Sequence, residues 1–155
     1  ITGNLTMGCW VNFDAPSTDA AVGVMSKWGT NDEQSYRIYK NASNEIVFAI
    51  TNDGTTDVDI DDSAANYAVD TWFFVVGKFV PSTSVRLFVN GTWYANTTGI
   101  PASIYSSTTA FEIGRYGGGN YLDGQVSQAF LCAYAVPDTV IEALYAHSKA
   151  MFMSR

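Results

Sequence analysis

The sequence predicts an all-β fold: an antiparallel two-sheet jelly-roll sandwich with one short C-terminal helix. Aromatic residues make up 14% of the chain, with nine Tyr, nine Phe and four Trp, and such residues favour pleated sheets. Segments in which apolar and polar residues alternate recur along the chain, separated by clusters of Gly, Asn, Asp and Ser. Only one segment, close to the C-terminus, has the apolar spacing that is typical of a helix.

Alternation predicts most of the strands directly. Strands are expected at residues 5–13, 21–28, 35–40, 45–51, 85–89, 111–115 and 125–134. The segment Trp72–Val80 is apolar on both faces, as is typical of a central strand that is covered on each side. Asn90-Gly91, followed by Thr92–Tyr94, predicts a tight hairpin, and a second turn is expected at Asn41–Asn44. About nine or ten short strands separated by turns are the pattern of a sandwich or jelly roll.

The predicted helix begins at Pro137 and Asp138. Proline suits the first helical turn, and an acidic side chain is favourable at the positive end of the helix dipole. Apolar residues then recur at helical spacing, and basic residues suit the far end, at Val140, Ile141, Leu144, Tyr145, His147 and Lys149. We expect this helix to pack against the β body.

Length and charge limit the classes of function. With 155 residues and 16.8 kDa, we expect residues 1–155 to form a single domain. The net charge of −7 leaves no surplus of Lys and Arg for DNA, RNA or anionic lipid surfaces. The longest apolar run is too short to cross a bilayer, so no membrane insertion is expected. No signal peptide is present and the chain begins at Ile1, so we expect a mature product or an excised segment.

Several motifs, taken in order, resemble a known family. The segment Leu5–Val11 resembles the opening strand of laminin G-like domains in the concanavalin A-like lectin/glucanase superfamily. The likeness continues in that family's order through Ser26-Lys27-Trp28, Tyr36–Ile38, Ile46–Ile50, Trp72, Leu87–Gly91, Ile113-Gly114, Gly124–Val126 and Ala135–Tyr145. It covers residues 4–146 and implies two packed antiparallel sheets.

Two departures from the family pattern bear on function. Ser127 and Gln128 stand where the family usually carries an acidic pair, so whatever those carboxylates do is lost here. The chain also begins almost directly at the Trp10 strand, without the strand that often precedes it. A sheet edge is therefore expected to be uncovered, or paired with a protein partner or a second copy of the chain.

The sequence argues against a hydrolase. Glycoside hydrolases need two carboxylates a few Å apart, and catalytic members of the superfamily place them in a Glu-x-Asp-x-x-Glu motif. None of the four glutamates has an aspartate two residues later: Glu33, Glu45, Glu112 and Glu142. A Ser-His-Asp triad would have to use His147, the only histidine, and the chain has no Gly-x-Ser-x-Gly motif to supply the serine. One His and two Cys also cannot supply the four ligands of a structural zinc site.

Calcium is the one metal for which the sequence offers candidate ligands. Asp57, Asp59 and Asp61 alternate with Val58 and Ile60, so the three carboxylates share one face of a strand. The same pattern is explained by a solvated edge strand blunted by charge, and it departs from an EF-hand loop. The family resemblance implies that Ca²⁺ could bind at the rim. Other candidate ligands are Asp14, Asp53 and Asp123.

The best candidate for a ligand site is a glycine-rich loop. Sugars are recognised by an aromatic face together with planar polar groups that match hydroxyls. Successive glycines allow the backbone to approach a ligand closely. The predicted glycan-binding residues are Trp28, Arg115, Tyr116, Gly118, Asn120, Tyr121 and Asp123, with Trp93 and Tyr94 as further candidates. The alternative is a loop without function whose tyrosines simply lie on the sheet.

The two cysteines lie in the first and last predicted strands, which the family resemblance places side by side. Cys9 and Cys132 could therefore form a disulfide, or remain as two neighbouring thiols.

Two functions follow from these patterns. The first is a non-catalytic carbohydrate-binding module, secreted or displayed on a cell or virion surface, whose partner is a glycan or glycosylated surface. The alternative is a structural or adhesion module of a virion, tail fibre or surface filament. The missing family carboxylates and the abundance of apolar strand surface support the alternative, but the glycine-rich loop makes the carbohydrate-binding module the better prediction.

Overall fold

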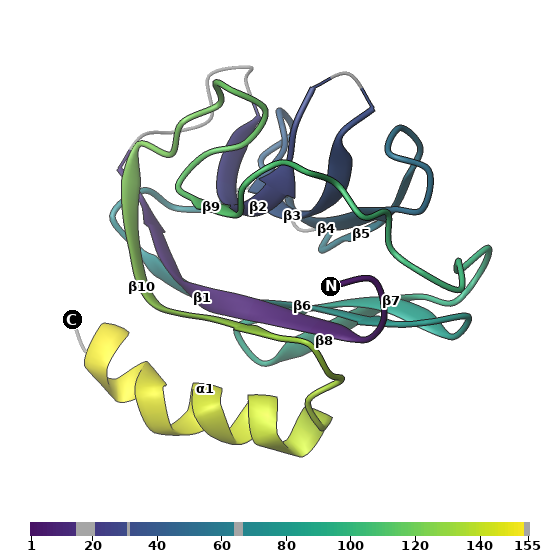
Figure 1. Cartoon of the computed structure of the whole chain (residues 1–155). Coiled ribbons are helices and arrows are strands. Elements are labelled where there is room, and N and C mark those ends of the chain that lie inside the picture. Colours follow the sequence, from purple (N-terminus) through teal and green to yellow (C-terminus); the bar gives the residue numbers. More distant parts are fainter. Residues whose placement is uncertain (15–20, 31, 64–66, 154–155) are drawn as a thin grey trace.

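The computed structural model consists of two stacked antiparallel sheets and a helix, which form three layers (Figure 1). It describes residues 1–14, 21–30, 32–63 and 67–153. The first sheet has the order β10 (Gly124–Cys132), β1 (Leu5–Phe13), β6 (Trp72–Val80), β7 (Ser84–Val89), β8 (Thr92–Asn96). The second has the order β5 (Asp57–Asp61), β4 (Ile46–Thr51), β3 (Gln34–Lys40), β2 (Val22–Trp28), β9 (Glu112–Ile113). The predicted sandwich is confirmed.

The main core lies between the two sheets. Alternate residues of β1 point into it, and they meet apolar residues of β3 and β4 from the facing sheet. Gly77 of β6 allows the sheets to approach, because a Cβ atom there would overlap the ring of Phe48 on β4. The fully buried side chains of this core include Leu5, Met7, Val11, Ile38, Phe48, Ile50, Phe79 and Leu87.

A second apolar layer joins the first sheet to the helix α1 (Asp138–Phe152). Trp10 points to this side of β1, where its ring stacks on Phe152 with centroids 4.5 Å apart and its Nε1 donates to Ser148 Oγ. At the start of the helix, Asp138 accepts hydrogen bonds from Lys78 and Arg86. The sheet is thus covered on both faces, which explains why β6 is apolar on both.

The predicted elements agree closely with the observed ones. β6 is the central strand of its sheet, and a hairpin at Asn90-Gly91 joins β7 to β8. The helix extends three residues beyond Lys149, the predicted basic end. The segment predicted as a strand over residues 111–115 pairs only at Glu112–Ile113, because Arg115 and the residues after it turn into a loop.

The expectation that a sheet edge is uncovered, or paired with another polypeptide, stays a prediction, and the strand order shows which strand it concerns. β1 is not an edge strand, because β10 pairs with it on one side and β6 on the other. β10 itself forms the edge of that sheet, beside the helix (Figure 1).

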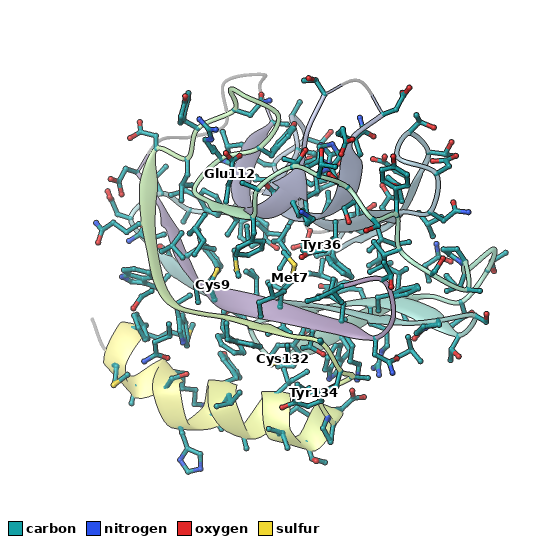
Figure 2. The ribbon with its side chains drawn as sticks, viewed as in Figure 1. Met7, Cys9, Tyr36, Glu112, Cys132 and Tyr134 are labelled. Atoms are coloured by element: carbon teal, nitrogen blue, oxygen red, sulfur yellow. The ribbon has the colours of Figure 1, made fainter. Side chains whose placement is uncertain are left out.

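The cysteines are neighbours in strand order but do not face each other. Cys9 belongs to the core between the sheets, whereas Cys132 lies opposite Thr6 and packs in the layer beneath the helix. Figure 2 shows the two side chains on opposite sides of the first sheet. Both are free thiols, and burial raises the pKa of the Cys9 thiol.

Among the residues described, no helix has both the length and the apolar character that crossing a membrane requires.

Candidate functional site

The glycine-rich loop lies against the outer face of the second sheet. A bridge between Tyr116 and Gly119 closes it into a tight turn, whose backbone is left-handed at Gly117 and Gly118, with φ angles of 63° and 76°. Hydrogen bonds fasten the loop to β2. Gly117 N donates to Trp28 O at 2.9 Å, and Gly23 N donates to Asn120 O at 2.9 Å. The loop is therefore attached to β2 near both ends of that strand.

A pocket of about 480 Å³ opens between this loop and the outer face of the second sheet. Its lining comes from four places in the chain: the end of β2, the strand β3, the start of β5 and the glycine loop. The lining residues are Trp28, Gly29, Thr30, Gln34, Arg37, Thr55, Asp57, Tyr116, Gly117 and Asn120. Three predicted glycan-binding residues, Trp28, Tyr116 and Asn120, are thus brought together.

Arg37 stands at the centre of this pocket within a cage of three aromatic rings. Its guanidinium carbon lies 4.0 Å from the ring centre of Trp28, 4.0 Å from that of Tyr39 and 4.7 Å from that of Tyr116. Tyr39 and Tyr116 also meet edge to face, 5.7 Å apart. Cation–π contacts of this kind contribute roughly 0.5–2 kcal/mol each, depending on desolvation. The cage fixes the guanidinium in place.

Asp57 completes the centre of the pocket. Its Oδ2 accepts a hydrogen bond from Arg37 Nη2 at 3.0 Å, and the Arg37 side chain is only 11% exposed. Desolvation by burial raises the pKa of Asp57 above its ordinary value, although the charge and hydrogen bond of Arg37 act in the opposite direction. Nearby Asp59 and Asp53 add to the increase. The pocket therefore contains a partly desolvated ion pair.

The remaining predicted glycan-binding residues lie outside this pocket. Arg115 Nε donates to Glu112 Oε1 at 2.8 Å, and its Nη1 donates to the hydroxyl of Tyr121 at 3.3 Å. Arg115 and Gly118 line a smaller neighbouring pocket of about 290 Å³, and Trp28, Gly29, Thr30 and Gly117 line both pockets. Tyr121 is 63% exposed. Asp123 lies farther along, where its backbone carbonyl accepts from Asp14 N.

Trp28 has a different role from the one predicted. It was expected as a stacking surface for a sugar, but only 3% of it is exposed and Arg37 covers one face of its ring. It serves as the floor of the cage. Tyr116 is partly exposed, and among the described residues that line the pocket it is the one aromatic side chain that is not buried.

The three aspartates considered for calcium do not converge. Asp57 pairs with Arg37, Asp61 Oδ1 accepts from Ser63 N and Oγ, and Asp59 lies between them on the strand. Within the described ranges, no group of three or more His, Cys, Asp or Glu side chains is arranged to hold a metal. β5 is an edge strand, as the alternative interpretation of this pattern requires. Calcium binding stays a prediction.

Sequence analysis missed Arg37, the central residue of the pocket. It was included only as part of the strand predicted at residues 35–40. A signal was present, since Tyr39 follows two residues later and must share its face. The other ring partners, Trp28 and Tyr116, are distant in sequence, and only the sheet order and the folded loop bring them to Arg37.

The two stacked five-stranded antiparallel sheets define a sandwich of the concanavalin A-like class. A family model described as the concanavalin A-like lectin/glucanases superfamily matches residues 2–141. The chain belongs to this superfamily. No curated protein sequence matches it.

Among solved structures, botulinum neurotoxin binding domains have the same fold. One, from work on neurotoxin type C and two ganglioside molecules, has a TM-score of 0.69 and 13% identity, covering 94% of this chain and 36% of that one. The serotype G binding domain has a TM-score of 0.69 and 13% identity, over 96% and 37%. The serotype DC domain in complex with rat synaptotagmin II has 0.67 and 14%, over 94% and 36%. The chain thus spans little more than a third of these proteins.

Proposed function

We propose that the chain is a non-catalytic carbohydrate-binding module, secreted or displayed on a surface, and that it binds a glycan in the pocket around Arg37. The observation that carries this proposal is the combination of an aromatic cage with planar polar side chains in one open pocket. Amides of Gln34 and Asn120, hydroxyls of Thr30 and Thr55, and the Arg37–Asp57 pair offer hydrogen bonds to sugar hydroxyls.

The solved structures with the same fold support the class of ligand in this proposal. One is described as dependent on two ganglioside molecules for cell entry, and ganglioside recognition is a form of glycan binding. Since these neighbours share the fold at low identity, the support concerns the class of ligand and not the residues that bind it.

The chemistry of the smaller pocket favours binding over hydrolysis. Glu33 and Glu112 both line it, but both carboxylates are engaged. The backbone N–H of Thr108 and the hydroxyl of Ser107 hold the pKa of Glu33 below its usual value, and Glu112 is paired with Arg115. A glycosidase needs one carboxylic acid whose pKa is raised so that it can donate a proton. Glu33 is shifted in the opposite direction.

A matched pair of tyrosine variants tests the proposal. Tyr116→Ala removes the accessible ring of the pocket, and Tyr121→Ala removes an exposed ring from the same loop outside it. On a broad panel of immobilised glycans, the bound sugars are expected to lose about tenfold or more in affinity with Tyr116→Ala and to change less than about threefold with Tyr121→Ala. Unfolding curves of both variants check that the loop change leaves the fold intact. A panel in which no glycan binds the unmodified protein would refute the proposal.

One observation favours a second candidate function, that of a structural or adhesion module. The edge strand β10 lies beside a helix face on which Val140, Leu144 and Met151 are each at least 45% exposed. Exposed apolar residues next to an unpaired strand edge are typical of an assembly surface. Sedimentation velocity over a range of concentrations tests this candidate. A strict monomer at millimolar concentration would remove its support.

A further inference from the structure

The charge inside the glycan pocket is already balanced. Arg37 is the single cation among the described residues that line it, and its Nη2 is paired with Asp57 at 3.0 Å. Asp59 and Asp53 lie close enough to Asp57 to act on its charge, and the chain as a whole carries −7. An acidic sugar would therefore enter a pocket that has no unpaired positive charge and that is surrounded by negatively charged carboxylates. Such an encounter is unfavourable, because like charges repel and the one guanidinium would have to leave its partner.

The donor and acceptor atoms that the ion pair does not use are complementary to a neutral group that both donates and accepts hydrogen bonds. Asp57 uses one carboxylate oxygen for Arg37, and no described residue donates to its Oδ1. On the other side of the pair, no described residue accepts a hydrogen bond from Arg37 Nη1, and the side chain keeps 11% of its surface exposed, whereas Nε is buried out of a ligand's reach. A free acceptor beside a guanidinium with spare donors is complementary to two adjacent hydroxyl groups, one donating to the carboxylate and the other accepting from the guanidinium.

The aromatic cage makes this arrangement rigid before any ligand arrives. Trp28, Tyr39 and Tyr116 hold the guanidinium plane from three directions, with ring centres at 4.0, 4.0 and 4.7 Å. A polar pair that is already oriented loses little conformational freedom on binding. Amides of Gln34 and Asn120 on the pocket wall can bind further hydroxyls without adding charge.

We infer that the pocket selects an uncharged sugar, which it holds through a vicinal diol bridging Asp57 and Arg37, and that it rejects sugars carrying a carboxylate. This inference rests on the proposed glycan-binding function and specifies its ligand class. It sets the chain apart from the structural neighbour associated with gangliosides, which carry sialic acid.

The first experiment compares neutral oligosaccharides with their own acidic derivatives. Lactose and 3′-sialyllactose, and glucose- and glucuronate-ended oligosaccharides, are immobilised in matched pairs at equal density. Neutral members are expected to bind about tenfold or more tightly than their acidic counterparts. Equal or tighter binding of the acidic members overturns the inference and leaves the glycan-binding function standing. Binding to no glycan removes both.

Blocking single hydroxyls tests the diol itself on the unmodified protein. Mono-deoxy and mono-O-methyl analogues of the tightest neutral ligand are titrated in turn. Loss of about tenfold or more in affinity at two adjacent ring positions, and at no isolated one alone, is the expected result. Affinity that is insensitive at every adjacent pair contradicts the bridging geometry.

Asp57→Asn tests which residue enforces selection. It removes the charge that neutralises Arg37 while keeping the shape of the side chain. Affinity for the neutral ligand is expected to fall about tenfold, and the preference over the acidic counterpart to shrink by a further similar factor. Asp59→Asn is the matched control, since it removes the same charge one outward-facing position along the strand without lining the pocket. An equal change of preference in both variants would show a general charge effect and contradict the role of the pair.

Discussion

The Arg37 guanidinium lies 4.0 Å from the ring centre of Trp28, and the two residues belong to neighbouring strands, β3 and β2. The centre of the candidate site is therefore built on the sheet, while the glycine loop supplies one wall. Sites built on strands hold their side chains more precisely than sites built on loops alone. Changes in the loop that spare Tyr116 should accordingly alter affinity without displacing Arg37.

The titration of Asp57 gives the glycan site a specific pH dependence. Its carboxylate accepts a hydroxyl in the proposed complex, so protonation abolishes that hydrogen bond. Desolvation raises the pKa of Asp57 above the ordinary value of 3.8, with Arg37 opposing and neighbouring aspartates adding to the shift. As pH falls, affinity for the neutral ligand is therefore expected to decline with a midpoint above 3.8.

Isothermal titration at a series of pH values measures this midpoint. Asp57→Asn, which has no carboxylate to titrate, should give a flat profile over the same range. A profile that declines identically in that variant would assign the pH dependence to another group.

Much of the fold could be predicted because local pattern and final environment agree. The apolar run Trp72–Val80 is the central strand, and Asn90-Gly91 forms the hairpin between β7 and β8 with φ angles of 46° and 103°. The segment around Glu112 and Arg115 was overpredicted as a strand. Its length of pairing is decided by the partner strand β2 and by the loop that follows, and neither is visible in the local pattern.

The candidate site could be predicted only in part. Composition identified the glycine loop, and Tyr116 and Asn120 do line the pocket. The exposure of an individual ring could not be predicted, so Trp28 was expected to stack on a ligand and is instead covered by Arg37. Which outward-facing residues of β3 and β5 meet beneath the loop depends on strand order, a long-range property of the chain.

Asp138 fastens the helix to the first sheet, and its removal should loosen that layer. Although burial alone would raise it, the pKa of Asp138 is lowered by hydrogen bonds and charges from Lys78 and Arg86. The stabilisation is thus present above the ordinary value of 3.8 and is lost as pH falls through the lower pKa of the folded state. Because Asp138 is partly exposed, we expect Asp138→Asn to cost about 1–2 kcal/mol, mainly by leaving buried Lys78 without its anion.

Urea unfolding at pH 7 and pH 3 measures this effect, which should be smaller at the lower pH. Glu142→Gln is the matched control on the same helix, since its amide oxygen can still accept from Trp93 Nε1. Equal destabilisation of the two variants would contradict the anchoring role of Asp138.

Gly77 controls how closely the two sheets pack. It lies in the central strand, and a Cβ atom there would overlap the ring of Phe48, which is fully buried on the facing sheet. Neither side can yield cheaply, because the ring is enclosed by the core and the strand is paired on both edges. Overpacking of a core costs about 1–3 kcal/mol and occasionally more, so Gly77→Ala should destabilise the fold by at least that amount.

Gly3→Ala is the control for Gly77→Ala, because no atom lies within 4 Å of the Cβ position at Gly3 and its backbone is not left-handed. Its free energy of unfolding should change by less than about 0.5 kcal/mol. The double variant Gly77→Ala with Phe48→Leu provides the decisive comparison, because a smaller side chain on β4 makes room for the added methyl group. If the second substitution recovers none of the lost stability, the Gly77 effect must come from the strand itself and not from contact between the sheets.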